Sequence, residues 1–312
     1  MKENFSMRTH YGVLMKKFMV KNKRIVILGA DTFGGTHVKF ASEEFPRRSI
    51  NFGISEQNMM AAAAGLASTN KIPIVNTYGM FASMRALEML RTAICLNNAN
   101  VKIVSSHCGL DVGQDGPTHQ IIEDISILRS IPNLKILTPM DKYELHSQLD
   151  WMIKYNGPVY LRTIRRKQGE FYKKKTNFKI GEWPIIKKGK NVTIICLQVT
   201  YPYVERAAFI LKNKYNISAQ IIHASSLKPV NENSFLKKIR DTKLIVTVED
   251  HNIYGGLGSI VSEILSTKMP KKLVRIGVKD RFGKSGAAEE IFKLYGISEN
   301  NIVKTILKKI KK

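Results

Sequence analysis

The sequence has few cysteines, few acidic residues and no long hydrophobic run, and each scarcity excludes a class of protein. The three cysteines, Cys95, Cys108 and Cys196, are odd in number and far apart. They therefore form neither a disulfide framework nor the paired spacing of a zinc site, and a reducing cytoplasm is the expected location. No run approaches the ~20 apolar residues needed to cross a bilayer, so we expect no membrane partner. No continuous apolar region near the N-terminus indicates a signal peptide.

The scarcity of acidic residues gives the chain a large positive charge. Its 25 Asp and Glu stand against 50 Lys and Arg, for a formal net charge of +25. Such an excess is compatible with nucleic-acid binding. However, the lysines spread along the whole chain, and no basic motif is interleaved with aromatic residues for stacking on bases. We therefore expect no nucleic-acid partner, and a lysine-rich surface that could meet an acidic protein or anionic substrates.

Apolar strand-like runs alternate with helix-like segments through both halves of the 312 residues, a length sufficient for two domains. Strands are expected at 24–29, 50–52, 73–76, 101–104, 135–137, 159–162, 192–197, 219–222, 244–248 and 273–276. Helices are expected at 8–20, 57–68, 82–96, 122–130, 142–154, 203–213, 231–240 and 257–265. The alternation predicts an α/β fold of two consecutive three-layer domains with mostly parallel sheets.

A basic, polar stretch with several glycines and a proline separates the two halves of this pattern. Such a composition is typical of a linker. We expect a first domain at 1–165, the linker at 166–190 and a second, smaller domain at 191–312.

The segment 107–120, HCGLDVGQDGPTHQ, follows an apolar strand. It is too polar for a core and too glycine-rich for a helix, so we expect a functional loop. His107, Asp115 and His119 suit hydrogen bonding to a polyhydroxylated substrate, and a histidine can transfer protons near neutral pH. A metal site is less favoured, because neither histidine has a second ligand at a helical spacing. We expect no metal on this chain.

Three further candidates follow the carboxyl ends of strands, where open α/β sheets bind ligands. Glu56 has apolar sequence neighbours, and we expect its carboxylate to exchange a proton near neutral pH. The alternative is an ordinary first-turn residue stabilised by the helix dipole. Tyr78 and Phe81 could stack on a planar ring, or they could be ordinary core aromatics. A glycine cluster at 254–258 is better explained as a tight turn than as a phosphate loop, since it lacks the lysine of a P-loop.

Together these segments resemble the C-terminal half of transketolase, an enzyme of the thiamine-diphosphate group. The matching motifs are FGISE at 52–56, TYGMF at 77–81 and above all GQDGPTHQ at 113–120. IPN at 131–133 and DRFG at 280–283 continue the match, which covers nearly the whole chain in order. The resemblance implies transfer of a two-carbon ketol unit from a ketose or ketose phosphate to an aldose or aldose phosphate.

On the cofactor side, the resemblance implies roles for three residues. Glu56 would be catalytic and would hydrogen-bond the aminopyrimidine ring of thiamine diphosphate. Phe81 would stack on that ring, and Tyr78 would pack beside it. Met84 stands where a cofactor-side tyrosine is often found, so the pyrimidine pocket is expected to be slightly remodelled.

On the substrate side, the resemblance implies that Asp115 and His119 contact the sugar hydroxyls near the reacting carbons, with His119 catalytic. His107, Arg162 and Arg8 would lie toward the phosphate end, where a guanidinium suits phosphate geometry.

One substrate-side position departs from the family pattern. Gly35 falls where the family has a phosphate-contacting serine, and Thr36 supplies the nearest hydroxyl in the sequence. An ordinary sugar phosphate is therefore not the only substrate to consider.

The largest departure from the family is an absence. Thiamine-diphosphate enzymes hold the diphosphate and its magnesium with a Gly-Asp-Gly segment followed by an asparagine, and Gln114-Asp115-Gly116 is not that motif. The resemblance therefore implies a split enzyme, in which an N-terminal transketolase subunit binds Mg2+ and the diphosphate. We expect an α2β2 heterotetramer with the cofactor between chains, and no turnover by this chain alone.

Two other assignments stay open beside transketolase. One is another thiamine enzyme subunit, similar to 1-deoxyxylulose-5-phosphate synthase or to the β subunit of a 2-oxoacid dehydrogenase. The segment IIED at 121–124 favours transketolase over the synthase. The other is a non-catalytic paralogue that serves as an assembly partner. For a transketolase, both the central pentose phosphate pathway and a specialised sugar pathway remain candidates.

Overall fold

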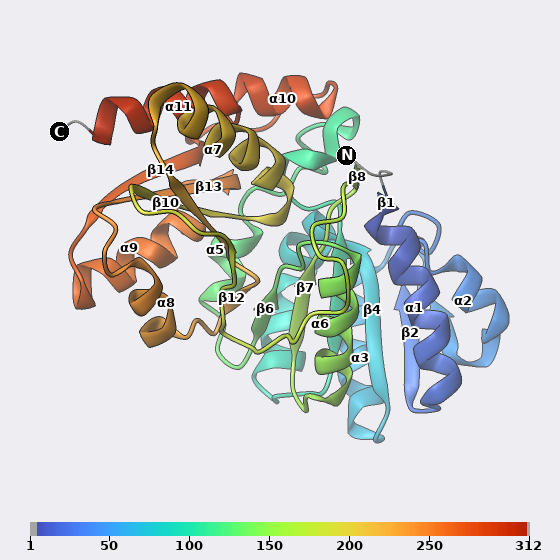
Figure 1. Ribbon diagram of the computed structural model, residues 1–312. Helices are drawn as coiled ribbons and strands as arrows, with labels where there is room; N and C mark the ends of the chain where they lie inside the picture. The colour runs from blue at the N-terminus through green and yellow to red at the C-terminus, as the bar shows by residue number, and fades with distance from the viewer. Residues whose placement is uncertain (1–4, 311–312) are drawn as a thin grey trace.

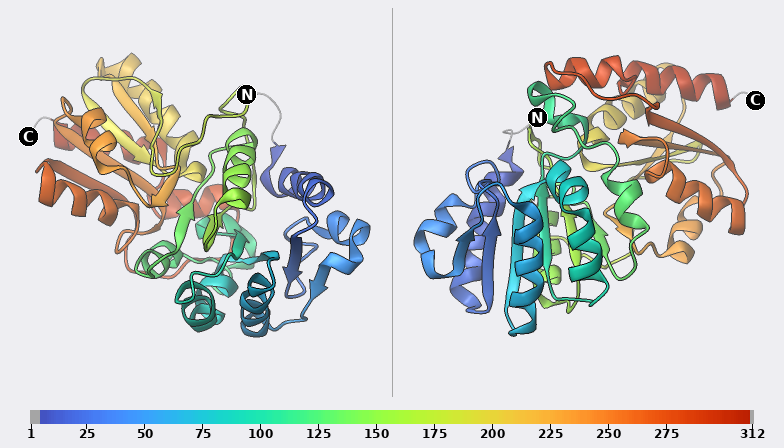
Figure 2. Two further views of the ribbon diagram at one scale, coloured as in Figure 1. Left: turned by 90° about the horizontal axis from the view of Figure 1, so that it is seen from below. Right: turned by 180° about the vertical axis from the view of Figure 1, so that it is seen from behind.

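The computed structural model describes residues 5–310 and arranges most of them as two large, mostly parallel sheets with helices on both faces (Figures 1 and 2). A third, two-stranded antiparallel sheet joins β1 (Phe5–Ser6) and β8 (Lys167–Gln168). Alternate residues of each strand enter different core clusters. In β2 (Ile25–Gly29), Ile25 and Ile27 belong to one cluster, whereas Val26 and Leu28 belong to the other. Because successive side chains of a strand point to opposite faces, both faces of the sheet are buried. The predicted α/β fold class is confirmed.

The first sheet has seven strands in the order β12-β6-β7-β5-β4-β2-β3. Besides β2, its strands are β3 (Ser49–Asn51), β4 (Ile72–Tyr78), β5 (Lys102–Ser106), β6 (Lys135–Leu137), β7 (Val159–Arg162) and β12 (Ser226–Lys228). All of these strands except β12 are parallel, so the carboxyl ends of β2 to β7 meet at one edge. That edge is where an α/β sheet binds ligands.

Helices cover the two faces of the first sheet. They are α1 (Met7–Lys21), α2 (Lys39–Glu44), α3 (Glu56–Ser68), α5 (Asp124–Arg129) and α6 (Lys142–Lys154). The segment predicted as one helix at 82–96 is instead a short α4 (Leu87–Met89) between two π-helical stretches, η2 (Phe81–Arg85) and η3 (Leu90–Cys95). The wider π turns change which side chains face the sheet edge, and such turns often occur at functional sites.

The second sheet has the order β14-β13-β10-β11-β9. Its strands are β9 (Ile185–Lys187), β10 (Val192–Cys196), β11 (Ala219–His223), β13 (Leu244–Asn252) and β14 (Lys272–Val278). Its helices are α7 (Tyr201–Tyr215), α8 (Glu232–Ile239), α9 (Leu257–Lys268), α10 (Ala288–Leu294) and α11 (Glu299–Ile310). Only β9 runs antiparallel to its neighbour.

The two halves are interlocked. The strand β12 (Ser226–Lys228) comes from the second half but pairs with β6 of the first sheet. The segment expected to be a linker is ordered. Its Phe171 and Tyr172 backbone N–H groups donate to Asp141, at 2.9 and 2.7 Å, and its Trp183 is 1% exposed. Asp141 also caps the N-terminus of α6, so this carboxylate fastens the segment to the first sheet.

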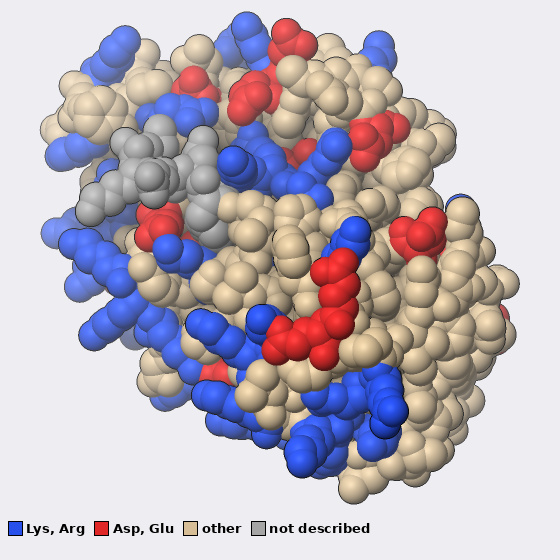
Figure 3. Space-filling view, turned by 90° about the vertical axis from the view of Figure 1, so that its right-hand side faces the viewer, with Lys and Arg blue, Asp and Glu red and all other residues tan. Residues whose placement is uncertain are grey.

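The surface is rich in lysine and arginine, as the composition requires. Figure 3 shows the face that carries α1 and α2, with basic clusters separated by uncharged and acidic side chains. Of the helices within residues 5–310, none is both long and apolar enough to cross a membrane.

Candidate active site

The candidate site lies at the carboxyl edge of the first sheet, where the loops after β2, β4, β5 and β7 meet. Tyr78 ends β4, and His107 follows β5. The two rings lie 4.0 Å apart between centroids. Phe81 stacks on Tyr78 at 5.7 Å and meets His119 edge-on at 5.4 Å. The structure therefore brings four of the predicted residues into one aromatic and imidazole cluster.

Glu56 begins α3 and is 1% exposed. The apolar residues next to Glu56 in the sequence do not form all of its surroundings, because Arg85 Nη1 approaches its two carboxylate oxygens at 3.2 and 3.0 Å. This contact comes from the π-helical stretch η2, which turns Arg85 toward the start of α3.

Arg85 also lies on the face of Phe81, with its guanidinium carbon 4.5 Å from the ring centroid. One flat, cationic group thus donates to the Glu56 carboxylate and stacks on an aromatic ring at the same time. A protonatable aromatic ring such as an aminopyrimidine has the same two properties. The pair of Glu56 and Phe81 therefore presents a hydrogen-bond acceptor and a ring face to one flat group of this kind.

The other end of the site is cationic. Burial and the nearby Arg165 guanidinium lower the pKa of Arg8, and Arg165 forms an ion pair with Asp115 at 3.2 Å. Burial lowers the pKa of His107 to about 3, and the charges of Arg8 and Arg165 contribute to this shift. His107 is therefore neutral near pH 7, and it can exchange hydrogen bonds with a hydroxyl without adding charge. Two guanidinium groups close enough to oppose each other's charge favour an anion between them.

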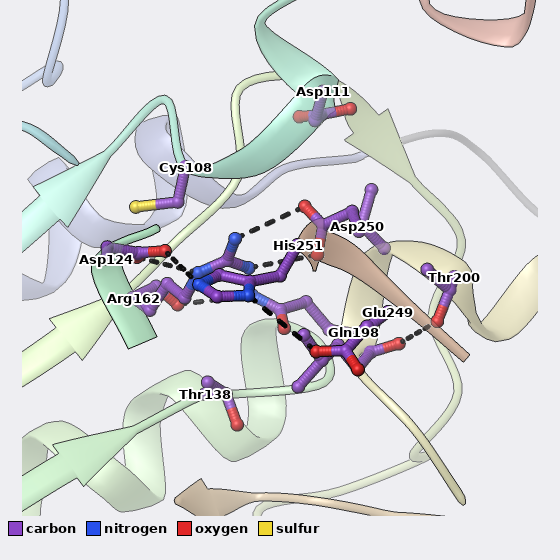
Figure 4. Close-up of polar contacts among 12 residues, drawn as sticks. Cys108, Asp111, Asp124, Thr138, Arg162, Gln198, Thr200, Glu249, Asp250 and His251 are labelled. Atoms are coloured by element: carbon purple, nitrogen blue, oxygen red, sulfur yellow. Dashed lines mark hydrogen bonds and ion pairs between the residues drawn. The ribbon is translucent and has the colours of Figure 1, made fainter. Parts of the chain in front are cut away.

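Arg162 does not lie at the phosphate end of the site, where it was predicted. Its side chain is 0% exposed and pairs with Asp124 at 2.9 Å and Asp250 at 3.2 Å (Figure 4). It is the last residue of β7, and its side chain points into the junction between the two halves. The guanidinium that does reach the site belongs to Arg165, three residues later and beyond the end of the strand.

The junction around Arg162 is an extended buried network (Figure 4). Glu249 accepts the backbone N–H groups of Leu257 and Gly258, at 2.7 and 2.9 Å, at the N-terminus of α9. Burial raises the pKa of Glu249 to about 8 and lowers that of the adjacent His251. Because these groups and Asp250 come from β13, the network joins the second sheet to β7 of the first.

The segment 107–120 also differs from the prediction of a polar loop outside the core, because part of it is helical and buried. Residues Gly109–Asp115 form 3-10 turns, and most of them are buried. The second half of the chain covers them: a Cβ on Gly109 would lie 1.8 Å from Asp250 Oδ2, and one on Gly116 would lie 2.3 Å from Ser285 Oγ. These glycines have positive φ, so the close approach and the turn geometry both require glycine.

Two polar side chains hold this segment in place. Asp111 is 2% exposed and accepts the backbone N–H groups of Arg165 and Arg166, at 2.7 and 2.9 Å. Gln120 Nε2 donates to the carbonyls of Gly113 and Lys284, at 3.1 and 3.0 Å. Gln114, Asp115, Pro117 and Thr118 remain exposed and His119 is half-buried. Of these residues, Asp115 lies beside Arg165 and His119 beside Phe81.

Sequence reasoning missed Arg85 and Arg165. A signal existed for Arg165, because residues just beyond a parallel strand reach the ligand edge more often than those within it. No sequence signal marked Arg85, which depends on the π turns. Thr36 does not supply the hydroxyl expected near Gly35. Its side chain is 2% exposed and donates to the Thr32 carbonyl at 2.8 Å.

Within residues 5–310, no cluster of three or more His, Cys, Asp or Glu side chains has an arrangement that could hold a metal ion.

Comparison with known proteins identifies both halves of the chain. The family model described as transketolase, pyrimidine binding domain, matches residues 3–169, and that described as transketolase, C-terminal domain, matches residues 181–302. A transketolase C-terminal section of Methanocaldococcus jannaschii is 41% identical over 98% of this chain and 96% of that protein. A 6-deoxy-6-sulfo-D-fructose transketolase subunit of Clostridium sp. is 32% identical, over 97% of this chain and 94% of that subunit.

A solved structure described as a split gene transketolase, inactive beta4 tetramer, superposes with a TM-score of 0.89. It is 33% identical and covers 99% of both chains. Full-length transketolases and 1-deoxy-D-xylulose-5-phosphate synthases also match, but this chain spans only about half of their length.

Proposed function

This chain belongs to the transketolase family, and from that premise we propose that it is the pyrimidine-binding and C-terminal subunit of a split, thiamine-diphosphate-dependent transketolase. The observation that carries the proposal is the shared contact of Arg85 with Glu56 and Phe81, which a protonatable ring can replace. The relatives of similar length described as a transketolase section or subunit support the split arrangement.

Within this proposal, the chain's residues divide the reaction between the two ends of the site. Bound thiamine diphosphate supplies the nucleophile and the electron sink for the two-carbon unit. Glu56 would hold the pyrimidine ring of the cofactor through a hydrogen bond, and Phe81 would stack on that ring. Arg85 could make room for such a ring by moving into solvent, since its side chain is already 48% exposed.

The substrate lies between the aromatic cluster and the cationic end. His119 stands beside Phe81, so it meets the sugar hydroxyls nearest the reacting carbons and moves their protons. Asp115 accepts a hydrogen bond from a further hydroxyl of the sugar, and the neutral His107 orients the middle of the sugar. Arg8 and Arg165 bind the anionic terminus of a ketose or aldose phosphate.

The remaining parts of the active site belong to a partner. We propose that an N-terminal transketolase subunit holds Mg2+ and the diphosphate, in an α2β2 assembly with this chain. The absence of a Gly-Asp-Gly motif supports this division. We place the assembly in the cytoplasm, because the three cysteines are free and buried.

Reconstitution tests the proposal. The chain is mixed with the N-terminal subunit co-purified from the host, thiamine diphosphate, Mg2+, a ketose phosphate and an aldose phosphate. We expect ketol transfer by the mixture and none by either subunit alone. Turnover by this chain alone contradicts the split assignment. Product formed only from pyruvate indicates the synthase or 2-oxoacid dehydrogenase class instead.

A matched pair of variants separates an enzyme subunit from a non-catalytic paralogue. Glu56→Gln keeps the shape of the side chain but removes its charge, and we expect turnover to fall by about a hundredfold or more. Glu43→Gln changes an exposed carboxylate on α2 and should leave turnover unchanged. Both variants should assemble with the partner, as measured by the mass of the complex. Equal activity in the two variants contradicts the catalytic assignment.

A further inference from the structure

The loop after β2 has an unusual contact with Tyr78. A Cβ placed on Gly35 would lie 1.9 Å from the Tyr78 hydroxyl and 2.8 Å from its Cζ. The hydroxyl therefore occupies the space that any side chain at position 35 would need. The Tyr78 ring cannot retreat easily, because Phe81 packs on it at 5.7 Å and His107 at 4.0 Å.

The Tyr78 hydroxyl ends at the cationic part of the site. Arg8 Nη1 donates to the Gly35 carbonyl at 2.7 Å, so this guanidinium is fixed next to the same glycine. Burial raises the pKa of Tyr78, which keeps the phenol protonated and able to donate. Arg8, Arg165 and Asp115 are the charged groups that interact with it.

Two hydrogen-bond donors beside Gly35 have no acceptor in the described part of the chain. Arg8 Nε is buried and has no hydrogen-bond partner among the described residues. The Tyr78 hydroxyl likewise makes no hydrogen bond within residues 5–310, although it is held in position by its ring. An unpaired buried donor such as the Arg8 Nε is costly, and an oxyanion here would accept hydrogen bonds from it and from the Tyr78 hydroxyl together.

We infer that Tyr78 and Gly35 form one complementary pair, in which the Tyr78 phenol, together with Arg8, recognises the terminal oxyanion of the sugar substrate. The residue predicted to flank the cofactor is thus a specificity-determining residue on the substrate side. This inference rests on the proposed function for the identity of the sugar, but not for the anion site itself. The class of ligand is a terminal group with three oxygens, a phosphate or a sulfonate.

Anion binding to the full chain, without partner or cofactor, tests the inference. Inorganic phosphate and methanesulfonate are titrated calorimetrically into the wild-type chain and Tyr78→Phe. The variant keeps the ring and its packing but loses the donor. We expect about tenfold weaker binding of the preferred anion, the usual effect of one hydrogen bond to a charged group. Tyr254→Phe is the matched control, because the Tyr254 side chain is 56% exposed. This variant should bind both anions as the wild type does.

The pairing with Gly35 has its own test. Gly35→Ser places a side chain on the Tyr78 hydroxyl and should weaken anion binding by about tenfold or more. Tyr78→Val combined with Gly35→Ser delivers a hydroxyl to the vacated space and should recover most of the loss. Equal anion affinity in the wild type, Tyr78→Phe and Gly35→Ser overturns the inference, as does a wild-type chain that binds neither anion. Because no ketol transfer is measured, failure of the proposed function leaves these results unchanged.

Discussion

A single methyl group added to the second half of the molecule should disturb the loop at the active site. Gly283 follows β14 and is buried against Gln120, the last residue of the segment 107–120. In Gly283→Ala the new Cβ would lie 1.7 Å from Gln120 Oε1 and 2.8 Å from Cδ. Gln120 is 2% exposed, so its amide has no solvent to move into. We therefore predict that the substitution displaces the amide and releases the loop.

The magnitude follows from the contacts of that amide. Its two hydrogen bonds, to Gly113 and Lys284, each contribute about 0.5–1.5 kcal/mol net. Forcing an extra methyl into a packed site costs about 1–3 kcal/mol. The two effects overlap, because the displaced amide also relieves the crowding. We expect the free energy of unfolding to fall by about 2–4 kcal/mol.

Urea denaturation of the full chain measures this loss. Gly65→Ala is the control, because a Cβ on this helical glycine meets nothing within 4 Å. It should be stabilising by up to about 1 kcal/mol. The double variant Gln120→Ala with Gly283→Ala should cost no more than Gln120→Ala alone, since the obstructing atom is gone. Costs that add in the double variant, or an unchanged Gly283→Ala, refute this reasoning.

Two further predictions concern the buried network at the junction. Arg162→Met leaves Asp124 and Asp250 buried without a cation, and should cost about 3–5 kcal/mol in urea denaturation. Glu249 has a pKa raised by burial from 4.5 to about 8, so the folded chain keeps a proton that the unfolded chain releases. The wild type should lose stability as pH rises through this window, whereas Glu249→Gln should show a flatter profile. Parallel pH profiles contradict the assignment of that proton to Glu249.

These predictions share one structural cause, which is that the second half of the chain shapes a site carried by the first. Asp250 approaches Gly109, Ser285 approaches Gly116, and the Lys284 carbonyl accepts from Gln120. The accessible Asp115 and His119 are therefore set in place by residues more than a hundred positions later in the chain. Substitutions at the junction should alter substrate affinity without touching the substrate.

The fold class was predictable from the sequence because its physical basis is local. Strands alternate their side chains with a period of two and helices with one of 3.6, so hydrophobic patterning alone separates them. Parallel strands then bring their carboxyl ends to one edge, which is why Tyr78, Phe81, His107 and His119 meet as expected. The prediction of one regular α-helix at 82–96 was wrong, since the pattern of hydrophobic residues does not reveal the π turns in this segment.

The motifs of the sequence determined the family and the order of the parts, because they record which residues recur at fixed spacing. Only the tertiary structure decided which charges serve the site. Arg162 and Arg165 carry the same side chain. Arg162 is buried in ion pairs with Asp124 and Asp250, whereas Arg165 forms an ion pair with Asp115 at the site. Arg85 meets Glu56 through a π turn, and Tyr78 meets Gly35 across two loops. Such choices depend on contacts between residues distant in sequence, and no local pattern encodes them.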